Sequence, residues 1–370
     1  MENKRNYGID LLRILCMIMI PVLHILGKGA LLSTPEKGSI YYNSAWLLEA
    51  FCYSAVNCFG IISGYVGYGR KVKYTNLVML WLRVIFYSVI IGLIFILVKP
   101  ELETTDIISS FFPTLTGAYW YFTAYAGMFL FTPFINKGLE SLSKKQLYVA
   151  IVIFLVLFSL LPTIGTLIIA PILGTNYNNM VNSFSLNAGY SVVWLSVLYI
   201  IGALMKKYDL PSKLKNNISL ILFVGCTLLN YLLLLLVNAL TNNVGLADDY
   251  LVMGYLNPLM VIAAYSLVCL CINLKIKNKL FIKLIEFFSP LCFSVYLIHM
   301  QPFVKKYALT NKFLFLLDYS PLVMVLMVIV YALLIFIVCS LIDELRELLF
   351  KKLKFKEKFS NLENKILSKD

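Results

Sequence analysis

Long apolar runs separated by short polar connectors make up most of the chain. Each run is close to the roughly 20 residues with which an α-helix crosses the hydrocarbon core of a bilayer. We therefore expect an all-α, polytopic integral membrane protein with about ten transmembrane helices and no separate soluble domain. The predicted spans are residues 8–27, 43–67, 77–98, 119–136, 147–161, 188–205, 218–240, 250–272, 282–300 and 321–345.

The same pattern divides the chain into a membrane domain over residues 1–350 and a basic tail over residues 351–370. The tail is rich in lysine and weakly amphipathic, so we expect it to lie on the inner leaflet, attracted by anionic lipids. The fifth span is short. It could extend through Pro162, or residues 164–174 could form a re-entrant segment.

Composition supports the membrane interpretation. Hydrophobic residues make up 60% of the chain and charged residues 14%, whereas a soluble domain is about half apolar and about a quarter charged. The net charge of +13 could indicate nucleic-acid binding, but the lysines lie in connectors between apolar runs, as membrane topology requires. The eight cysteines lie inside apolar runs without a C-x-x-C pair, so we expect small buried side chains rather than disulfides or metal ligands.

The lysines and arginines also predict the orientation. With the N-terminus in the cytoplasm, 24 of the 32 basic residues fall on the inner side, and two, Arg13 and Arg83, fall inside spans. This asymmetry predicts that both termini are cytoplasmic, which requires an even number of spans. We expect the protein in the plasma membrane. The six basic residues of the outer loops are Lys28, Lys37, Lys99, Lys305, Lys306 and Lys312.

Three ionisable side chains, Asp10, Arg13 and His24, lie inside the first span. Each costs roughly 2.5–3.5 kcal/mol on insertion scales, so each needs a reason to be there. Asp10 and Arg13 are three residues apart and can pair on one helical face. Arg13 and His24 are eleven residues apart, which places them on one face about 16 Å apart. A snorkelling arginine or a structural histidine could explain either residue alone, but the shared face favours function.

His299 ends the ninth span and lies near its outer end, at a level similar to that of His24. These are the two histidines of the chain. Glu49 in the second span lies at a similar level and is a candidate partner for either histidine.

Arg83 lies about as far into the third span as Arg13 lies into the first, so both arginines are expected at one inner level. Arginine binds phosphates through two parallel hydrogen bonds. Arg70, Lys71 and Lys73 would raise the local concentration of a polyanion, although the topology rule alone also accounts for them.

The second span contains Asn57 and Ser63, either of which could stabilise an oxyanion. Gly60 and Gly64 form a G-x-x-x-G pair, which predicts close helix packing. No Walker loop, H-E-x-x-H or G-x-S-x-G motif occurs, and two histidines leave little scope for a metal site, so we expect no metal.

The run from Asp10 to Arg13, followed ten residues later by His24, resembles the D-x-x-R-x10-H signature of the membrane acyltransferase-3 family. Three later stretches resemble further motifs of that family in the same order. They are Val56–Asn57 with Ile62–Ser63–Gly64–Tyr65 (V-D/N…S-G-Y/F), Trp120–Tyr121–Phe122 (W-F/Y) and the segment from Ser294 through Tyr296–Leu297 to His299 (S…Y-L-x-H).

The resemblance implies a ten-span helical core that uses acetyl-CoA or another acyl-CoA as donor. It implies that His24 is catalytic, as general base or as nucleophile, and that Arg13 and Arg83 take part in activity or donor binding. We add Asp10 to the catalytic residues as the partner of Arg13, and Ser63 to the donor site.

The resemblance further implies that the acceptor is a sugar hydroxyl of a surface glycan or of its lipid-linked precursor. One position departs from the family, because Leu80 stands where many members have the first arginine of R-x-x-R. A flippase of lipid-linked sugars is the main alternative, since it too would bury charges, but it should show broken helices or inverted repeats. The residues expected to contact the acceptor are Glu49, Asn57, Trp120, Tyr121 and His299.

Overall fold

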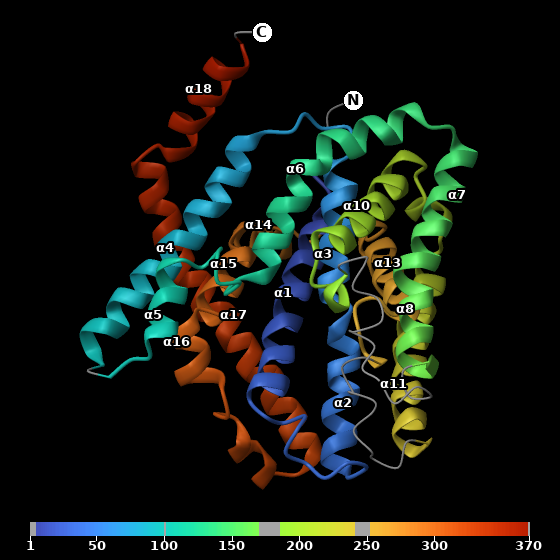
Figure 1. Cartoon of the computed structure of the whole chain (residues 1–370), viewed down its shortest axis with the longest axis vertical. Helices are drawn as coiled ribbons and strands as arrows, with labels where there is room; N and C mark the ends of the chain where they lie inside the picture. Colours follow the sequence, from blue (N-terminus) through green and yellow to red (C-terminus); the bar gives the residue numbers. More distant parts are fainter. Residues whose placement is uncertain (1–4, 100, 170–185, 241–251, 369–370) are drawn as a thin grey trace.

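The computed structural model describes residues 5–99, 101–169, 186–240 and 252–368, and all regular structure in these ranges is helical. The helices form an elongated bundle, and the described chain begins and ends at the same end of it (Figure 1). The all-α class is thus confirmed.

Seven helical segments of the described ranges are long and apolar enough to cross a membrane. This supports a multi-pass membrane protein, while the number of about ten spans is not confirmed. The seven segments are α1 (Tyr7–Lys28), α2 with α3 (Ile40–Tyr53 and Ala55–Gly67), α4 (Tyr74–Val98), α7 with α8 (Lys144–Leu155 and Leu161–Ile164) and its π-helical turns through Ile169, α11 (Asn216–Leu240), α14 with α15 (Lys279–Phe288 and Cys292–His299) and α17 (Pro321–Lys352).

The other three predicted spans also contain helices. They are α6 (Trp120–Ser141), α10 (Val192–Lys207) and α13 (Pro258–Ile272). Helices α10 and α13 have 16 and 15 residues, which at about 1.5 Å per residue is shorter than a hydrocarbon core of about 30 Å. The shorter elements are α5 (Thr104–Phe111), α16 (Pro302–Val304), α18 (Phe355–Leu367), single 3₁₀ turns at Asn187–Gly189, Pro211–Lys213, Ser289–Leu291 and Leu314–Asp318, and a π-helical turn at Lys305–Leu309.

The fifth predicted span continues as a helix through Pro162 to Ile169, as expected if the span extends beyond residue 161. The end of the segment suggested to re-enter, residues 170–174, lies outside the described residues. Domain boundaries are not tested by the fold, but the predicted border at residue 350 falls inside α17.

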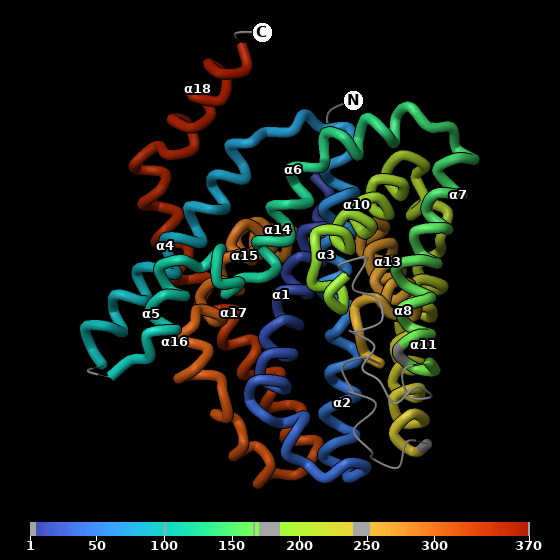
Figure 2. Tube along the Cα trace, viewed as in Figure 1, coloured from blue at the N-terminus to red at the C-terminus, as the bar shows by residue number. Residues whose placement is uncertain are grey.

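Helix α1 and the α2–α3 segment lie in the middle of the bundle, where Figure 2 shows α2 continuing into α3 beside α1. Both segments are mostly buried, whereas only 22% of the apolar stretch of α4 and 28% of those of α11 and α17 are buried. An unbroken outward apolar stripe of this kind suits lipid rather than water. On α17 the stripe consists of Leu322, Leu326, Val330, Leu334, Ile337, Leu341, Leu345 and Leu348.

Close packing of α3 against α10 confirms the prediction from the G-x-x-x-G pair. A Cβ atom on Gly64 would collide with the carbonyl group of Tyr199, and one on Gly202 would collide with that of Ile61. The two backbones can therefore approach each other only because both glycines lack side chains. This approach brings the C-terminal end of α10 beside the end of α3, where Lys206 lies over the Tyr65 ring at 5.2 Å.

Helix α18 is tied to the start of α4. The Glu363 carboxylate accepts hydrogen bonds from the backbone N–H groups of Tyr74 at 2.8 Å and Thr75 at 3.0 Å. Lys73, the N-cap residue of α4, makes no side-chain capping bond. Glu363 thus satisfies two donors that a helix start leaves free. The predicted contact of the tail with the inner leaflet stays a prediction.

Candidate active site

One cavity of about 1600 Å³ follows α1 along its whole length. Arg13 lines it near the N-terminal end of α1, and His24 lines it near the C-terminal end. The shared face predicted for these two residues is therefore a cavity wall. The lining residues of α1 and of the two positions before it are Arg5, Asn6, Ile9, Asp10, Arg13, Met17, Ile20, Leu23, His24, Gly27 and Lys28.

The end of the cavity near the chain termini is strongly cationic. Asp10 is the carboxylate that lines it there, among the described residues. Such an excess of positive charge on one wall suits a polyanion. The sequence predicted a common inner level for Arg13 and Arg83, because they lie equally far into their spans. The other basic side chains come from connectors and from the end of α10. The basic lining residues at this end are Arg5, Arg13, Arg70, Arg83, Lys206 and Lys207.

Asp10 holds Arg13 in place, as the spacing predicted. Its carboxylate accepts hydrogen bonds from Arg13 Nη1 at 2.7 Å, Arg5 Nε at 2.6 Å and Ser289 Oγ at 3.1 Å. The Asp10 side chain is 7% exposed and that of Arg13 is 31% exposed. The carboxylate is thus an anchor inside the wall, and the guanidinium group keeps donors free for a ligand.

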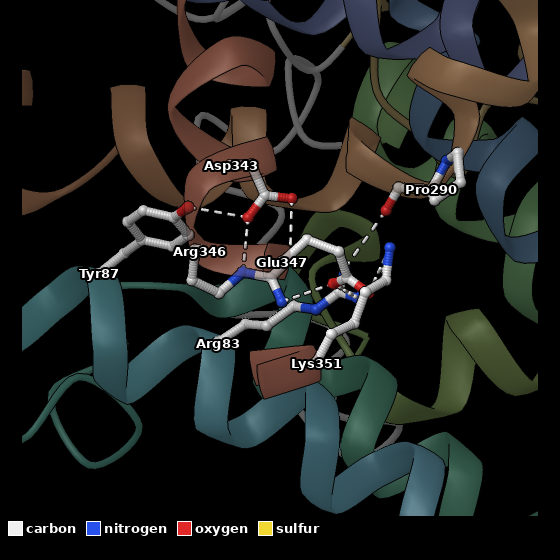
Figure 3. A network of polar contacts seen from close by, with 7 residues as sticks. All are labelled: Arg83, Tyr87, Pro290, Asp343, Arg346, Glu347 and Lys351. Atoms are coloured by element: carbon white, nitrogen blue, oxygen red, sulfur yellow. Dashed lines mark hydrogen bonds and ion pairs between the residues drawn. The ribbon is translucent and has the colours of Figure 1, made fainter. Parts of the chain in front are cut away.

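Arg83 lines the same end but is held more loosely (Figure 3). Its Nη2 lies 3.4 Å from Glu347 Oε2, and its Nη1 lies 3.3 Å from the carbonyl oxygen of Pro290. Both distances are long for charge-assisted hydrogen bonds. Its Nε is buried and has no partner among the described residues. Arg83 can therefore exchange Glu347 for another anion at little cost.

A second acidic–basic network adjoins Arg83 without lining the cavity. Arg346 Nε and Nη2 donate to the two oxygens of Asp343 at 2.7 and 2.9 Å, and Tyr87 Oη donates to Asp343 at 2.8 Å (Figure 3). Arg346 also donates to Glu347 at 2.8 Å. The sequence offered a signal for this network, because Asp343 and Arg346 repeat the D-x-x-R spacing of α1.

The two histidines meet at the other end of the cavity. His24 Nδ1 lies 2.8 Å from His299 Nε2, and His299 Nδ1 lies 2.5 Å from the carbonyl oxygen of Val295. A carbonyl oxygen only accepts, so His299 Nδ1 carries the proton and its Nε2 accepts from His24 Nδ1–H when both rings are neutral. The lone pair of His24 is then on Nε2, which makes no hydrogen bond to the described residues.

Glu49 lines the cavity but forms no hydrogen bond with either histidine in the described part of the chain. Its expected pairing with a histidine is therefore not found. His299 is 2% exposed and does not line the cavity, so it supports His24 rather than facing a substrate.

The remaining predicted residues differ in position. Trp120 and Tyr121 line the cavity. Ser63 lines it too, but its hydroxyl donates to the carbonyl of Phe59 at 2.8 Å. Asn57 is fully buried and does not line the cavity, since its amide donates to Tyr255 O and accepts from Trp194 Nε1. The expected contact of Asn57 with substrate is thus unsupported, and its amide instead joins α3 to α10 and to the segment before α13.

No group of three or more histidine, cysteine, aspartate or glutamate side chains in the described ranges could hold a metal ion. The profile of a protein family described as an acyltransferase domain matches residues 6–343. That range contains every residue of the cavity lining except Arg5. Comparisons with curated proteins and with solved structures gave no match.

Proposed function

The chain belongs to the acyltransferase-3 family, and on that premise we propose that it is a membrane O-acyltransferase. Its donor is cytoplasmic acyl-CoA, most simply acetyl-CoA, and its acceptor is a hydroxyl of a surface saccharide or of the lipid-linked precursor. The observation that carries the proposal is the single cavity lined by Arg13 and Arg83 at one end and by His24 at the other.

The cationic end suits the phosphates of coenzyme A. Arg13 has a free edge of its guanidinium group, and Arg83 is held only loosely. Each guanidinium group can therefore donate two parallel hydrogen bonds to phosphate oxygens. Arg70, Lys206 and Lys207 add positive charge around them. Arg5 and Asn6, just before α1, line this end, and α1 begins at the end of the bundle where both chain ends lie (Figure 1). Cytoplasmic termini and a cytoplasmic donor therefore belong to the same proposal.

The narrow arm of the donor then points along α1 toward His24, about 16 Å from Arg13 by helical rise. Side chains of Met17, Ile20, Val56 and Phe59 line the stretch between them. Apolar walls exclude water from the thioester, which protects it from hydrolysis.

At His24 the chemistry is acyl transfer with Nε2 as the general base. Nε2 takes the proton of the acceptor hydroxyl while the hydroxyl oxygen bonds to the thioester carbonyl carbon. The C–S bond then breaks, and His24 returns the proton to the departing thiolate, which leaves an ester and free coenzyme A. His299 positions the ring, because its protonated Nδ1 is committed to Val295.

The test is His24→Ala in purified full-length protein supplied with labelled acetyl-CoA and de-esterified surface glycan from the source cells. We expect the rate of ester formation per folded molecule to fall by about 10²- to 10⁴-fold, the usual contribution of a general base. Binding of acetyl-CoA should stay unchanged, because the phosphates lie at the other end of the cavity. Near-normal turnover would refute the role of His24.

His299→Gln is the companion variant. It should lower kcat and alter the pH profile while leaving the KM for acetyl-CoA unchanged, since His299 acts through His24 and does not line the cavity. A hydroxylamine-sensitive acyl-protein in the wild type would show that Nε2 acts as a nucleophile instead of a base. A flippase would move lipid-linked sugar normally in both variants.

A further inference from the structure

Four aromatic side chains gather at the His24 end of the cavity, and all of them line it. The Tyr53 and Tyr255 rings stack at 4.6 Å, and Trp120 lies 4.4 Å from Tyr190 and 6.2 Å from Tyr255 between ring centroids. These rings come from α2, from the start of α6 and from the segments before α10 and α13. A wall of aromatic rings inside a cavity offers broad faces to the apolar C–H surface of a sugar ring.

Glu49 adds an unsatisfied polar group to this wall. Its side chain lines the cavity although the residue is only 2% exposed, and its Oε2 has no hydrogen-bond partner among the described residues. Burying a carboxyl oxygen without a donor is costly, so the fold keeps a binding group available at the expense of stability. A carboxylate is an acceptor, and what it lacks here is a hydroxyl or amide donor.

Lys28 and Lys305 line the same end. The neighbouring Lys306 pairs with Glu103 at 2.6 Å and Asp106 at 2.9 Å, whereas Lys305 has no ion pair with the described residues. Burial, and next the charge of Lys28, lower the pKa of Lys305. Lys28 and Lys305 are therefore close enough on the cavity wall for their charges to interact. Asp106 acts on Lys305 more weakly than Lys28 does, and neither lysine forms an ion pair with a described residue.

We propose that this end of the cavity is an acceptor subsite for a saccharide that carries an anionic group. The sugar ring packs on the wall of Tyr53, Trp120, Tyr190 and Tyr255, a ring hydroxyl donates to Glu49, and a phosphate or carboxylate of the acceptor lies between Lys28 and Lys305. This rests on the proposed function, and it names the class of acceptor, an acidic or phosphorylated glycan unit. Recognition by groups of opposite charge also fixes which hydroxyl faces His24.

The experiment uses full-length protein in nanodiscs and the de-esterified surface glycan of the source cells, intact or with its phosphates and carboxylates removed. The variants are Glu49→Gln and Lys305→Gln. The matched controls are Glu36→Gln and Lys312→Gln, which change exposed side chains of the loops near this end. Glycan binding is measured by quenching of tryptophan fluorescence, and transfer is measured with labelled acetyl-CoA.

We expect Glu49→Gln to raise the Kd and the KM for intact glycan at least tenfold and to leave acetyl-CoA binding unchanged. Lys305→Gln should weaken binding of the intact glycan and not of the uncharged one. Both controls should behave as wild type. Equal loss of affinity for the two glycan forms in Lys305→Gln would refute the anionic group, and an unchanged KM in Glu49→Gln would refute the subsite.

Because glycan binding is measured separately from acyl transfer, the subsite and the proposed function can fail independently. Wild-type protein that binds the glycan through Glu49 but transfers no acyl group keeps the subsite and refutes the transferase. Protein that transfers acyl groups with no dependence on Glu49 or Lys305 keeps the transferase and refutes the subsite. Absence of both binding and transfer refutes both.

Discussion

Two Asp–Arg pairs with the same spacing lie near the same end of the molecule. Asp10 and Arg13 on α1 are joined at 2.7 Å, and Asp343 and Arg346 on α17 are joined at 2.7 and 2.9 Å. The Arg13 side chain is 31% exposed and lines the cavity, whereas the Arg346 side chain is 1% exposed and does not line it. One pair presents its arginine to the cavity, and the other joins α17 to α4.

The difference comes from the neighbours. Tyr87 of α4 donates a hydrogen bond to Asp343, the partner of Arg346 (Figure 3). Arg346 Nη1 donates to Glu347, so each nitrogen of the Arg346 guanidinium group has a partner. Arg13 has partners only on the side of Asp10. The D-x-x-R spacing thus predicts that an ion pair forms. The packing around the pair decides whether its arginine faces the cavity or is enclosed between helices.

The largest effect is expected for Arg346→Ala. Removing one partner of a buried ion pair leaves the other charge uncompensated, which costs about 3–5 kcal/mol. Thermal unfolding of the purified protein should show this loss, and Arg13→Ala should lose much less. Asp343→Leu combined with Arg346→Met should recover most of the stability. Similar losses in the two single variants would remove burial as the difference between the pairs.

A smaller effect, on binding rather than stability, is expected for Arg13→Ala. Hydrogen bonds to a charged group contribute about 1.5–3 kcal/mol, so acetyl-CoA affinity should fall by about 10- to 150-fold. Equilibrium dialysis with labelled acetyl-CoA measures it. Tyr87→Phe serves as the control on the bracing pair, and it should change the unfolding temperature and leave the affinity as it is. Intact affinity in folded Arg13→Ala would refute the binding role of this pair.

The smallest effects are expected where the two networks meet, at Arg83 and Glu347. Arg83→Lys should lower acetyl-CoA affinity by roughly tenfold, because a point charge does not replace a planar fork. Glu347→Gln should raise affinity by a few-fold, since Arg83 no longer has to leave a carboxylate to reach phosphate. The same dialysis assay reads both changes. A lower affinity in Arg83→Lys together with a higher affinity in Glu347→Gln would support competition between Glu347 and the donor for Arg83. A change of affinity in the same direction in both variants would contradict it.

Local geometry explains what could be predicted from the sequence. Positions three and eleven residues apart on one helix share a face wherever the helix lies, so the Asp10–Arg13 pair and the common wall with His24 followed from spacing alone. The G-x-x-x-G pair predicted close helix packing in the same way, because residues four apart lie on one helical face. The helical class followed from the apolar runs, but hydropathy does not show where a helix begins, and α10 and α13 begin four and eight residues later than predicted.

Contacts between distant segments could not be predicted in the same way. The His24–His299 bond joins residues 275 positions apart, and the aromatic wall joins four segments without a common motif. Asn57 is an example of a residue that a motif singles out but that does not reach the cavity. It lies in a motif of the family, yet tertiary contacts to Trp194 and Tyr255 use both of its polar atoms. Only folding decides whether a polar side chain faces the cavity or the core.

The link between Glu363 and the start of α4 has a consequence for biosynthesis. The backbone N–H of Tyr74 finds its carboxylate partner 289 residues later in the chain. At about 5–20 residues per second, the ribosome needs roughly 15–60 s to make that stretch. During this time the first turn of α4 lacks the carboxylate that caps it in the finished chain. Nascent chains halted before residue 363 should therefore expose the segment around Tyr74 to protease, and release of the finished chain should protect it.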